Sequence, residues 1–268
     1  MDSTAQALAG KVVVIIGATS GLGLSATHAC LRAGAKVVAV GPPDAPAASI
    51  ADARLTDACA FASADARDPA TAESAIDLAL QKFGAFHALY HVAGGSGRAH
   101  GDGPLHDITD DGWNFTLDLN LRSVFNSNRA AVRQFLKQGG GGCVVNLSSV
   151  LAFAPSPTYF ATHAYAAAKA GIIGMTRSAA AHYAPQNIRF NVIAPALVDT
   201  PMAQRAARDE TIQQFIRTKQ PLDGGRIGRA EDLDAAVVFL LSDAAKFVTG
   251  QVLSVDGGWS VSDGQAPT

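Results

Sequence analysis

The apolar positions of this chain fall into short continuous runs, separated by longer stretches in which apolar and polar residues mix at helical spacing. The clearest run is KVVVII at 11–16, whose β-branched residues do not alternate with polar ones. A continuous run of this kind is typical of a strand buried on both faces of a parallel sheet. It leads directly into the glycine-rich segment GATSGLG at 17–23, and the pattern then predicts a helix over 24–33 that Gly34 closes.

The same rhythm continues to the end of the chain, apart from the Ala/Pro-rich stretch 41–56, to which no element is assigned. Further strands are predicted at 36–40, 58–62, 86–92, 143–147, 188–193 and 251–255. Helices are predicted at 69–83, 111–138, 160–184, 200–217 and 230–241. Strands that alternate with helices, without repeats or a linker, predict a single α/β domain over 1–268. We expect a Rossmann-like, doubly wound parallel sheet of about seven strands with helices on both faces.

The glycine-rich segment is the first candidate binding site. A tight turn between a strand and a helix presents free backbone N–H groups and the positive end of the helix dipole, where a pyrophosphate can bind. Glycine-rich turns also occur as plain connections, but the strand before this one and the helix after it favour a dinucleotide site. A second flexible segment, AGGSG at 93–97, follows the strand at 86–92. It falls at the carboxyl end of a strand, where open α/β sheets bind ligands.

Composition and charge exclude several classes of function. The formal net charge is −2 and the pI is near 6.4, so no basic field exists to attract nucleic acid or an anionic membrane. The apolar runs are too short to span a bilayer, and the N-terminus lacks the pattern of a signal peptide. The cysteines lie far apart, and the seven histidines show no ligand spacing, so neither a disulfide framework nor a metal site is predicted. We expect a soluble protein of the reducing cytoplasm.

Candidate chemistry lies in the segment HAYAAAKAG at 163–171. On a helix, Tyr165 and Lys169 share a face because they are four residues apart. A free phenol titrates near ~10, and a neighbouring ammonium lowers that pKa, which would make the tyrosine a usable acid or base. A packed ring beside a solvated amine is the alternative.

Taken in order, these motifs resemble those of the short-chain dehydrogenase/reductase family over nearly the whole chain. The glycine turn matches the family pattern GxxxGxG at Gly17, Gly21 and Gly23, and the segment VDGG at 255–258 matches its terminal motif. The resemblance also places Asp65, at the end of the third strand, against an adenine. It implies an NAD(P)-dependent enzyme that interconverts a secondary alcohol and a ketone by hydride transfer.

The resemblance implies a catalytic set of Asn120, Ser149, Tyr165 and Lys169. In these roles Ser149 donates a hydrogen bond to the substrate oxygen and Tyr165 exchanges the proton. Lys169 lowers the pKa of the tyrosine and binds the nicotinamide ribose, while Asn120 breaks the long helix and holds a water. The cofactor is NAD or NADP, and the residues implied to contact it are Gly17, Thr19, Ser20, Gly21, Leu22, Gly23, Asp65, Ala66, Ala93, Gly94, Tyr165, Lys169, Pro195, Val198 and Thr200.

The chain departs from the family in ways that leave choices open. Ser149 and Tyr165 are sixteen residues apart, longer than is usual, so an insertion beside the substrate is expected, and Ser148 is an alternative for the serine role. Gly41 and Pro42 stand where relatives carry the acidic or basic residues that select NAD or NADP, so no preference is predicted. Asp44 could favour NAD. His91 replaces an asparagine that ties neighbouring strands together.

The substrate loops are expected at 94–110, 150–163 and 201–220. Within them Tyr159, Phe160 and His163 either line the pocket or pack within the loop, and 201–220 is a lid or an ordinary exposed helix. Two further functions remain as alternatives: a 3-oxoacyl-carrier-protein reductase, although no basic patch would dock an acidic carrier, and a non-catalytic cofactor-binding regulator. The expected binding partner is a small-molecule alcohol or ketone substrate. Through its two long helices the chain is expected to form a homotetramer or homodimer.

Overall fold

A seven-stranded parallel sheet lies at the centre of the computed structural model, which describes residues 6–44 and 57–265. The strand order is β3-β2-β1-β4-β5-β6-β7, which confirms the predicted α/β fold class. The strands are β1 (Val12–Ile16), β2 (Lys36–Gly41), β3 (Cys59–Ser63), β4 (Ala88–His91), β5 (Gly142–Leu147), β6 (Ile188–Pro195) and β7 (Val252–Val255). Successive strands are added to one side of β1 as far as β3 and to its other side from β4 onward. Open parallel sheets bind ligands at such a switch point, which here lies between β1 and β4.

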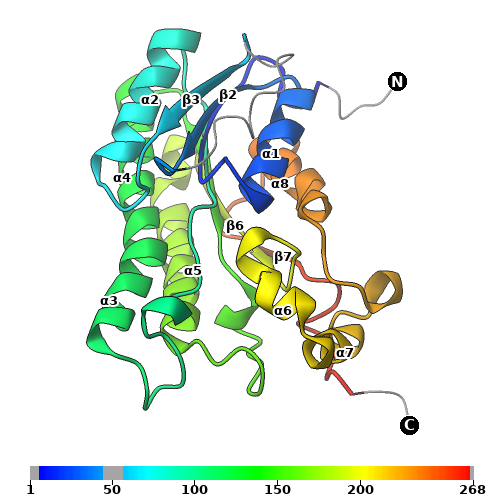
Figure 1. The fold of residues 1–268 in the computed structure, drawn as a ribbon. Helices are drawn as coiled ribbons and strands as arrows, with labels where there is room; N and C mark the ends of the chain where they lie inside the picture. The colour runs from blue at the N-terminus through cyan, green and yellow to red at the C-terminus, as the bar shows by residue number, and fades with distance from the viewer. Residues whose placement is uncertain (1–5, 45–56, 266–268) are drawn as a thin grey trace.

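Helices cover both faces of the sheet (Figure 1). On one face lie α1 (Gly21–Arg32) and α8 (Asp234–Leu241), and on the other α2 (Ala70–Phe83), α4 (Ser123–Gln138) and α5 (His163–Tyr183). The remaining helices, α3 (Asp110–Leu117), α6 (Gln204–Arg208) and α7 (Glu210–Lys219), lie toward the lower end of the view in Figure 1. None of the helices over 6–44 and 57–265 has the length and hydropathy to cross a membrane.

The first strand shows why its sequence is apolar throughout. Val13 and Ile15 pack into the core beneath α1 and α8, whereas Val12, Val14 and Ile16 pack beneath α2 and α4. Side chains alternate between the two faces of a strand, and here both faces are covered, so every position of β1 is buried.

Several predicted boundaries were wrong. The first helix begins at Gly21 rather than residue 24, and β3 ends at Ser63, which leaves Asp65 in the turn that follows. The helix predicted at 200–217 is divided into α6 and α7 at Asp209, whose carboxylate accepts the N–H groups of Thr211 and Ile212 and so begins a new helix. The predicted break at Asn120 is confirmed as a π-helical turn, Asp118–Arg122, between α3 and α4. Of the unassigned stretch 41–56, Gly41 ends β2, and residues 45–56 lie outside the described residues.

Candidate active site

The glycine-rich turn lines one side of a cavity of about 290 Å³ at the carboxyl ends of β1 and β4. Two of its glycines are required by close packing: an added Cβ at Gly23 would lie 1.8 Å from the backbone oxygen of Gly17, and one at Gly17 would lie 2.5 Å from the backbone nitrogen of Ala93. Gly23 itself lies behind the cavity. The predicted cofactor residues that line it are Gly17, Thr19, Ser20, Gly21, Leu22, Asp65, Ala66, Ala93, Gly94 and Thr200.

The start of α1 fits a pyrophosphate. Ser20 precedes the helix, but its side chain makes no capping hydrogen bond, and the first turn carries no acidic residue. The first N–H groups of a helix have no partner within it, so at α1 they remain as donors at the positive end of its dipole. An anion at this position would meet donors and no repelling carboxylate, as the binding of a dinucleotide requires.

Asp65 and Gly41 line the far end of this cavity, where β2 and β3 end. Asp65 accepts hydrogen bonds from Arg67, at 2.6 Å from Nη2, and these bonds hold the pKa of Asp65 below its usual range. Gly41 faces the side chain of Thr19, which an added Cβ would approach to 2.2 Å. An acidic residue at position 41 therefore has no room unless Thr19 moves. Asp44 is exposed and is not among the residues that line the cavity.

A second cavity, of about 390 Å³, lies beside the first and shares Leu22, Leu147, Thr200 and Met202 with it. Its wall is mainly apolar, and it contains the side chains of Ser149 and Tyr165. Of the predicted cofactor residues, Leu22, Pro195, Val198 and Thr200 lie in this wall as well. The two cavities thus bring the predicted cofactor segment and two of the four predicted catalytic residues together.

The structure distinguishes between the two neighbouring serines. Ser148 is buried, and its hydroxyl donates a hydrogen bond of 2.8 Å to the backbone oxygen of Lys169. Ser149 accepts the N–H of Leu151 at 3.2 Å, and its hydroxyl proton is directed to the phenol of Tyr165 rather than to the backbone. Ser149 also acts on Tyr165, because its hydrogen bond with the phenol lowers that pKa against the larger opposing effect of burial. The geometry therefore favours Ser149 over Ser148 as the serine that can donate a hydrogen bond to a substrate.

In this structure burial has the largest effect on the pKa of Tyr165, and the predicted effect of Lys169 is not among the causes of its shift. Burial raises the pKa of Tyr165 to about 12, and burial lowers the pKa of Lys169 to about 7. The Lys169 ammonium lies 5.5 Å from the centre of the Tyr165 ring and donates instead to the backbone oxygen of Leu147, at 3.0 Å. At neutral pH Tyr165 is thus a protonated phenol, which is the form that donates a proton.

Asn120 and Lys169 lie behind the two cavities and converge on Gly94. A Cβ added there would lie 2.7 Å from the Asn120 Oδ1 and 3.3 Å from the Lys169 Nζ. Asn120 is fully buried, and its amide group accepts the N–H of Gly95 and donates to the oxygen of the same residue. Asn120 therefore fixes the loop that follows β4, next to the amine of Lys169.

Asp102 is a residue of the site that the sequence did not point to. It is 5% exposed, and its two carboxylate oxygens accept the backbone N–H groups of Ala164 and Tyr165, at 3.0 and 3.1 Å. These are first-turn N–H groups of α5, so the carboxylate satisfies two free donors at the positive end of the helix dipole. Because Asp102 is 62 positions from Ala164, no local pattern could have paired them.

The two alternatives for the loop residues Tyr159, Phe160 and His163 divide between them. Phe160 lines the wall, whereas Tyr159 and His163 do not. The Tyr159 ring packs against Phe215 of α7, with ring centres 5.0 Å apart. His91, which replaces the expected asparagine, ties β4 to α4 rather than to a neighbouring strand, through a 2.7 Å hydrogen bond with Ser127. Burial lowers the pKa of His91 to about 3, so this ring is neutral.

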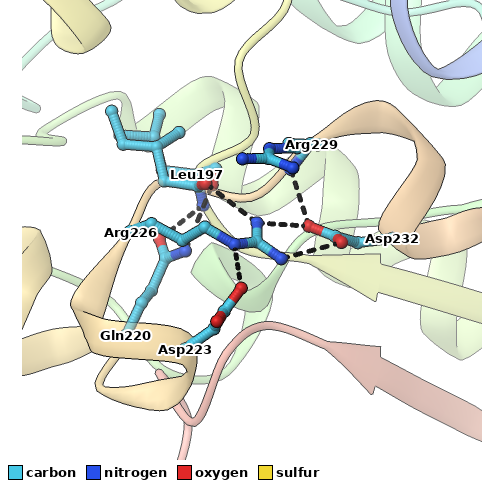
Figure 2. Close-up of polar contacts among 7 residues, drawn as sticks. Leu197, Gln220, Asp223, Arg226, Arg229 and Asp232 are labelled. Carbon is cyan, nitrogen blue, oxygen red and sulfur yellow. Dashed lines mark hydrogen bonds and ion pairs between the residues drawn. The ribbon is translucent and has the colours of Figure 1, made fainter.

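Segment 201–220 is held at its base by a network that Figure 2 shows. The side-chain amide of Gln220 accepts the N–H of Leu197 at 3.0 Å and donates to its oxygen at 3.2 Å. Beside it, Arg226 donates to the carboxylates of Asp223 and Asp232. The network joins the end of the segment to the residues that follow β6, where the cavity wall begins.

The comparisons with known proteins agree with this architecture. A family model described as "Enoyl-(Acyl carrier protein) reductase" matches residues 17–260. The chain belongs to the short-chain dehydrogenase/reductase family. Members of this family are NAD(P)-dependent enzymes that act on hydroxyl and carbonyl groups, and this chain is such an oxidoreductase.

Individual relatives of this dehydrogenase/reductase match over nearly their whole length. It is 34% identical to the cis-4-hydroxycyclohexanecarboxylate dehydrogenase of Sinomonas cyclohexanicum, over 95% of this chain and 98% of that protein. It is 32% identical to the 3-oxoacyl-[acyl-carrier-protein] reductase of Thermotoga maritima, over 94% of this chain and 98% of that protein. The crystal structure of levodione reductase has a TM-score of 0.83 and 30% identity, and covers 94% of this chain and 98% of that one.

Proposed function

We propose that this dehydrogenase/reductase interconverts a secondary alcohol and a ketone on a small molecule, with Tyr165 as the proton donor and acceptor. One observation carries the proposal: the hydroxyls of Ser149 and Tyr165 share a mainly apolar cavity that adjoins the dinucleotide cavity at Leu22 and Thr200. A carbonyl in this cavity lies within reach of two hydroxyl groups and beside the cofactor segment. When bound, the nicotinamide cofactor supplies or accepts the hydride.

The remaining steps fall to the side chains of this chain. Ser149 donates a hydrogen bond to the substrate oxygen and stabilises the negative charge that grows on it during reduction. The phenol of Tyr165, protonated because burial raises its pKa to about 12, passes its proton to that oxygen. In the oxidation direction Tyr165 must first lose this proton. Lys169 and Asn120 hold the loop at Gly94 and the backbone of β5 in register with the cavity.

The site supports a free small molecule over a substrate carried on a protein. The cavity of about 390 Å³ is bounded by the loops after β4, β5 and β6, and its size is in the range of small-molecule pockets. The relatives include both kinds of enzyme, one that acts on cis-4-hydroxycyclohexanecarboxylate and one named for an acyl carrier. With a formal net charge of −2, the chain carries no excess of basic residues to bind an acidic carrier protein.

We further propose that residues 1–268 form one domain that assembles into a homotetramer or homodimer in the cytoplasm. The outer surface of α4 carries Phe125 and Leu136, which are 43% and 49% exposed. On α5, an added Cβ at Gly174 would meet nothing within 4 Å, so another backbone could approach closely. The three cysteines are buried free thiols, as suits a reducing compartment. Light scattering at micromolar concentration tests the assembly, and a monomer would contradict it.

The activity is tested by a panel of cyclic and linear ketones and of acyl-carrier-linked substrates, each with NADH and NADPH. We expect turnover of free ketones with at least one cofactor. Cofactor binding without turnover of any substrate would instead identify a regulator. A strong preference for carrier-linked substrates would assign the chain to the acyl-carrier reductases.

A further inference from the structure

The wall of the substrate cavity carries charge of only one sign. Among the described residues that line it, Arg98 and Arg205 are the charged ones, and the others are apolar or neutral polar. Arg98 begins a short 3-10 helix, Arg98–His100, after β4, and Arg205 lies on α6. Two segments that are far apart in the sequence therefore each contribute a guanidinium to one cavity.

Arg98 and Arg205 are both exposed side chains at the wall of this one cavity, and both carry a positive charge. The pKa of Arg98 is lowered, first by partial burial and then by the charge of Arg205. Within the described part of the chain, no carboxylate lies within ion-pair distance of either guanidinium. Asp102 is the carboxylate that acts on Arg98, but both of its oxygens accept backbone N–H groups at the start of α5. The pair is thus a cationic site that has no ion-pair partner among the described residues.

A carboxylate is the ligand that suits this arrangement. The guanidinium group is planar, stays charged, and donates two parallel hydrogen bonds that match the two oxygens of a carboxylate. An anion between Arg98 and Arg205 would replace their repulsion by two attractions. The rest of the wall, including Leu151, Phe160 and Trp259, offers apolar surface to the body of a ligand.

We propose that the substrate is an apolar hydroxy acid or keto acid, whose carboxylate binds Arg98 and Arg205 while its hydroxyl or carbonyl oxygen faces Ser149 and Tyr165. This inference deepens the proposed function and rests on it. The carboxylate would also connect the loop after β4 to α6, so that a bound substrate joins the two sides of the cavity.

The test compares an acid with a neutral molecule of the same shape. Reduction of 4-oxocyclohexanecarboxylate and of 4-oxocyclohexanecarboxamide is measured in the wild type, Arg98→Gln and Arg205→Gln. Because a hydrogen bond to a charged group is worth about tenfold or more in affinity, we expect the wild type to prefer the acid by about that factor in kcat/KM. In each variant this preference should fall toward one, mainly through KM. Arg208→Gln, which removes the same charge from an exposed position of α6 outside the cavity wall, should keep it.

A binding measurement separates this inference from the proposed activity. Calorimetry of cyclohexanecarboxylate and cyclohexanecarboxamide, with the protein saturated with oxidised cofactor, requires no turnover. Tighter binding of the carboxylate that is lost in Arg98→Gln and Arg205→Gln supports the inference even if neither ketone is reduced, a result that would refute only the proposed activity. Equal binding of the two compounds by the wild type would overturn the inference that Arg98 and Arg205 bind a carboxylate. So would variants that weaken cofactor binding and leave the acid preference intact, because the arginines would then serve the cofactor phosphates.

Discussion

Replacing Asp102 with asparagine tests whether a carboxylate holds the catalytic helix in place. In the wild type its two oxygens accept the N–H groups of Ala164 and Tyr165 at 3.0 and 3.1 Å, and Asp102 is 5% exposed. Asparagine keeps one oxygen as an acceptor, but it turns an NH₂ group toward the second N–H. The variant thus loses one hydrogen bond and the negative charge at the start of α5.

The expected cost follows from these two losses. A hydrogen bond to a charged group contributes roughly 1.5–3 kcal/mol, and a charge at a partly buried helix terminus contributes up to about 2 kcal/mol. We therefore expect Asp102→Asn to lower the free energy of unfolding by about 3 kcal/mol. In a chain of this length 1 kcal/mol changes Tm by about 2–4 °C, so the expected decrease is about 6–12 °C.

Differential scanning calorimetry at one protein concentration measures this decrease. The matched control is Asp107→Asn, which removes the same charge from an exposed side chain in the same loop and should change stability by less than about 0.5 kcal/mol. Because Tyr165 is in the first turn of α5, kcat for ketone reduction should also decrease, even at temperatures well below the new Tm. A variant whose Tm lies within about 2 °C of the wild-type value would have lost no more than about 1 kcal/mol, and this result would refute the argument.

Three further predictions concern the cofactor, the amine and the base of segment 201–220. Because burial lowers the pKa of Lys169 to about 7, its charged hydrogen bond to the oxygen of Leu147 weakens as the pH rises through about 7; kcat/KM for reduction should fall over this range, and Lys169→Met should lack this step. Gly23→Ala places a Cβ 1.8 Å from a backbone oxygen and should weaken cofactor binding in calorimetry by about tenfold or more, whereas Gly140→Ala, which meets nothing within 4 Å, should not. Arg226→Gln removes the ion pairs at the base of the segment and should speed its cleavage by chymotrypsin, in contrast to the exposed Arg177→Gln; equal cleavage rates would contradict this role.

The architecture could be predicted because the signals that specify it are local. The run at 11–16 is apolar throughout because both faces of β1 are covered, and the glycine turn follows it within a few residues. Boundaries were less predictable because capping depends on side-chain geometry. Asp209, for example, divides a predicted helix by accepting two N–H groups, which an uninterrupted helical pattern does not reveal.

The chemistry of the site depends on burial and on contacts between distant residues, which one sequence does not display. The spacing of Tyr165 and Lys169 predicted that they share a face, but not that burial would raise the pKa of the phenol and lower that of the amine. Asp102 holds the start of α5 from 62 positions away. Arg98 and Arg205 come together only because the loops after β4 and β6 border one cavity. Each of these features required the fold to be known.

The most direct test of the proposed chemistry is deuteride transfer by Tyr165→Phe. Reduction of a ketone from the panel is followed with cofactor deuterated at the transferring carbon, in the wild type, Tyr165→Phe and Tyr159→Phe. Tyr159 loses the same hydroxyl but lies outside the cavity wall. We predict a labelled alcohol from the wild type and Tyr159→Phe, and a rate lower by roughly 10²–10⁴-fold in Tyr165→Phe with cofactor binding retained. Labelled product formed by Tyr165→Phe at the wild-type rate would contradict the assignment of Tyr165 as the proton donor.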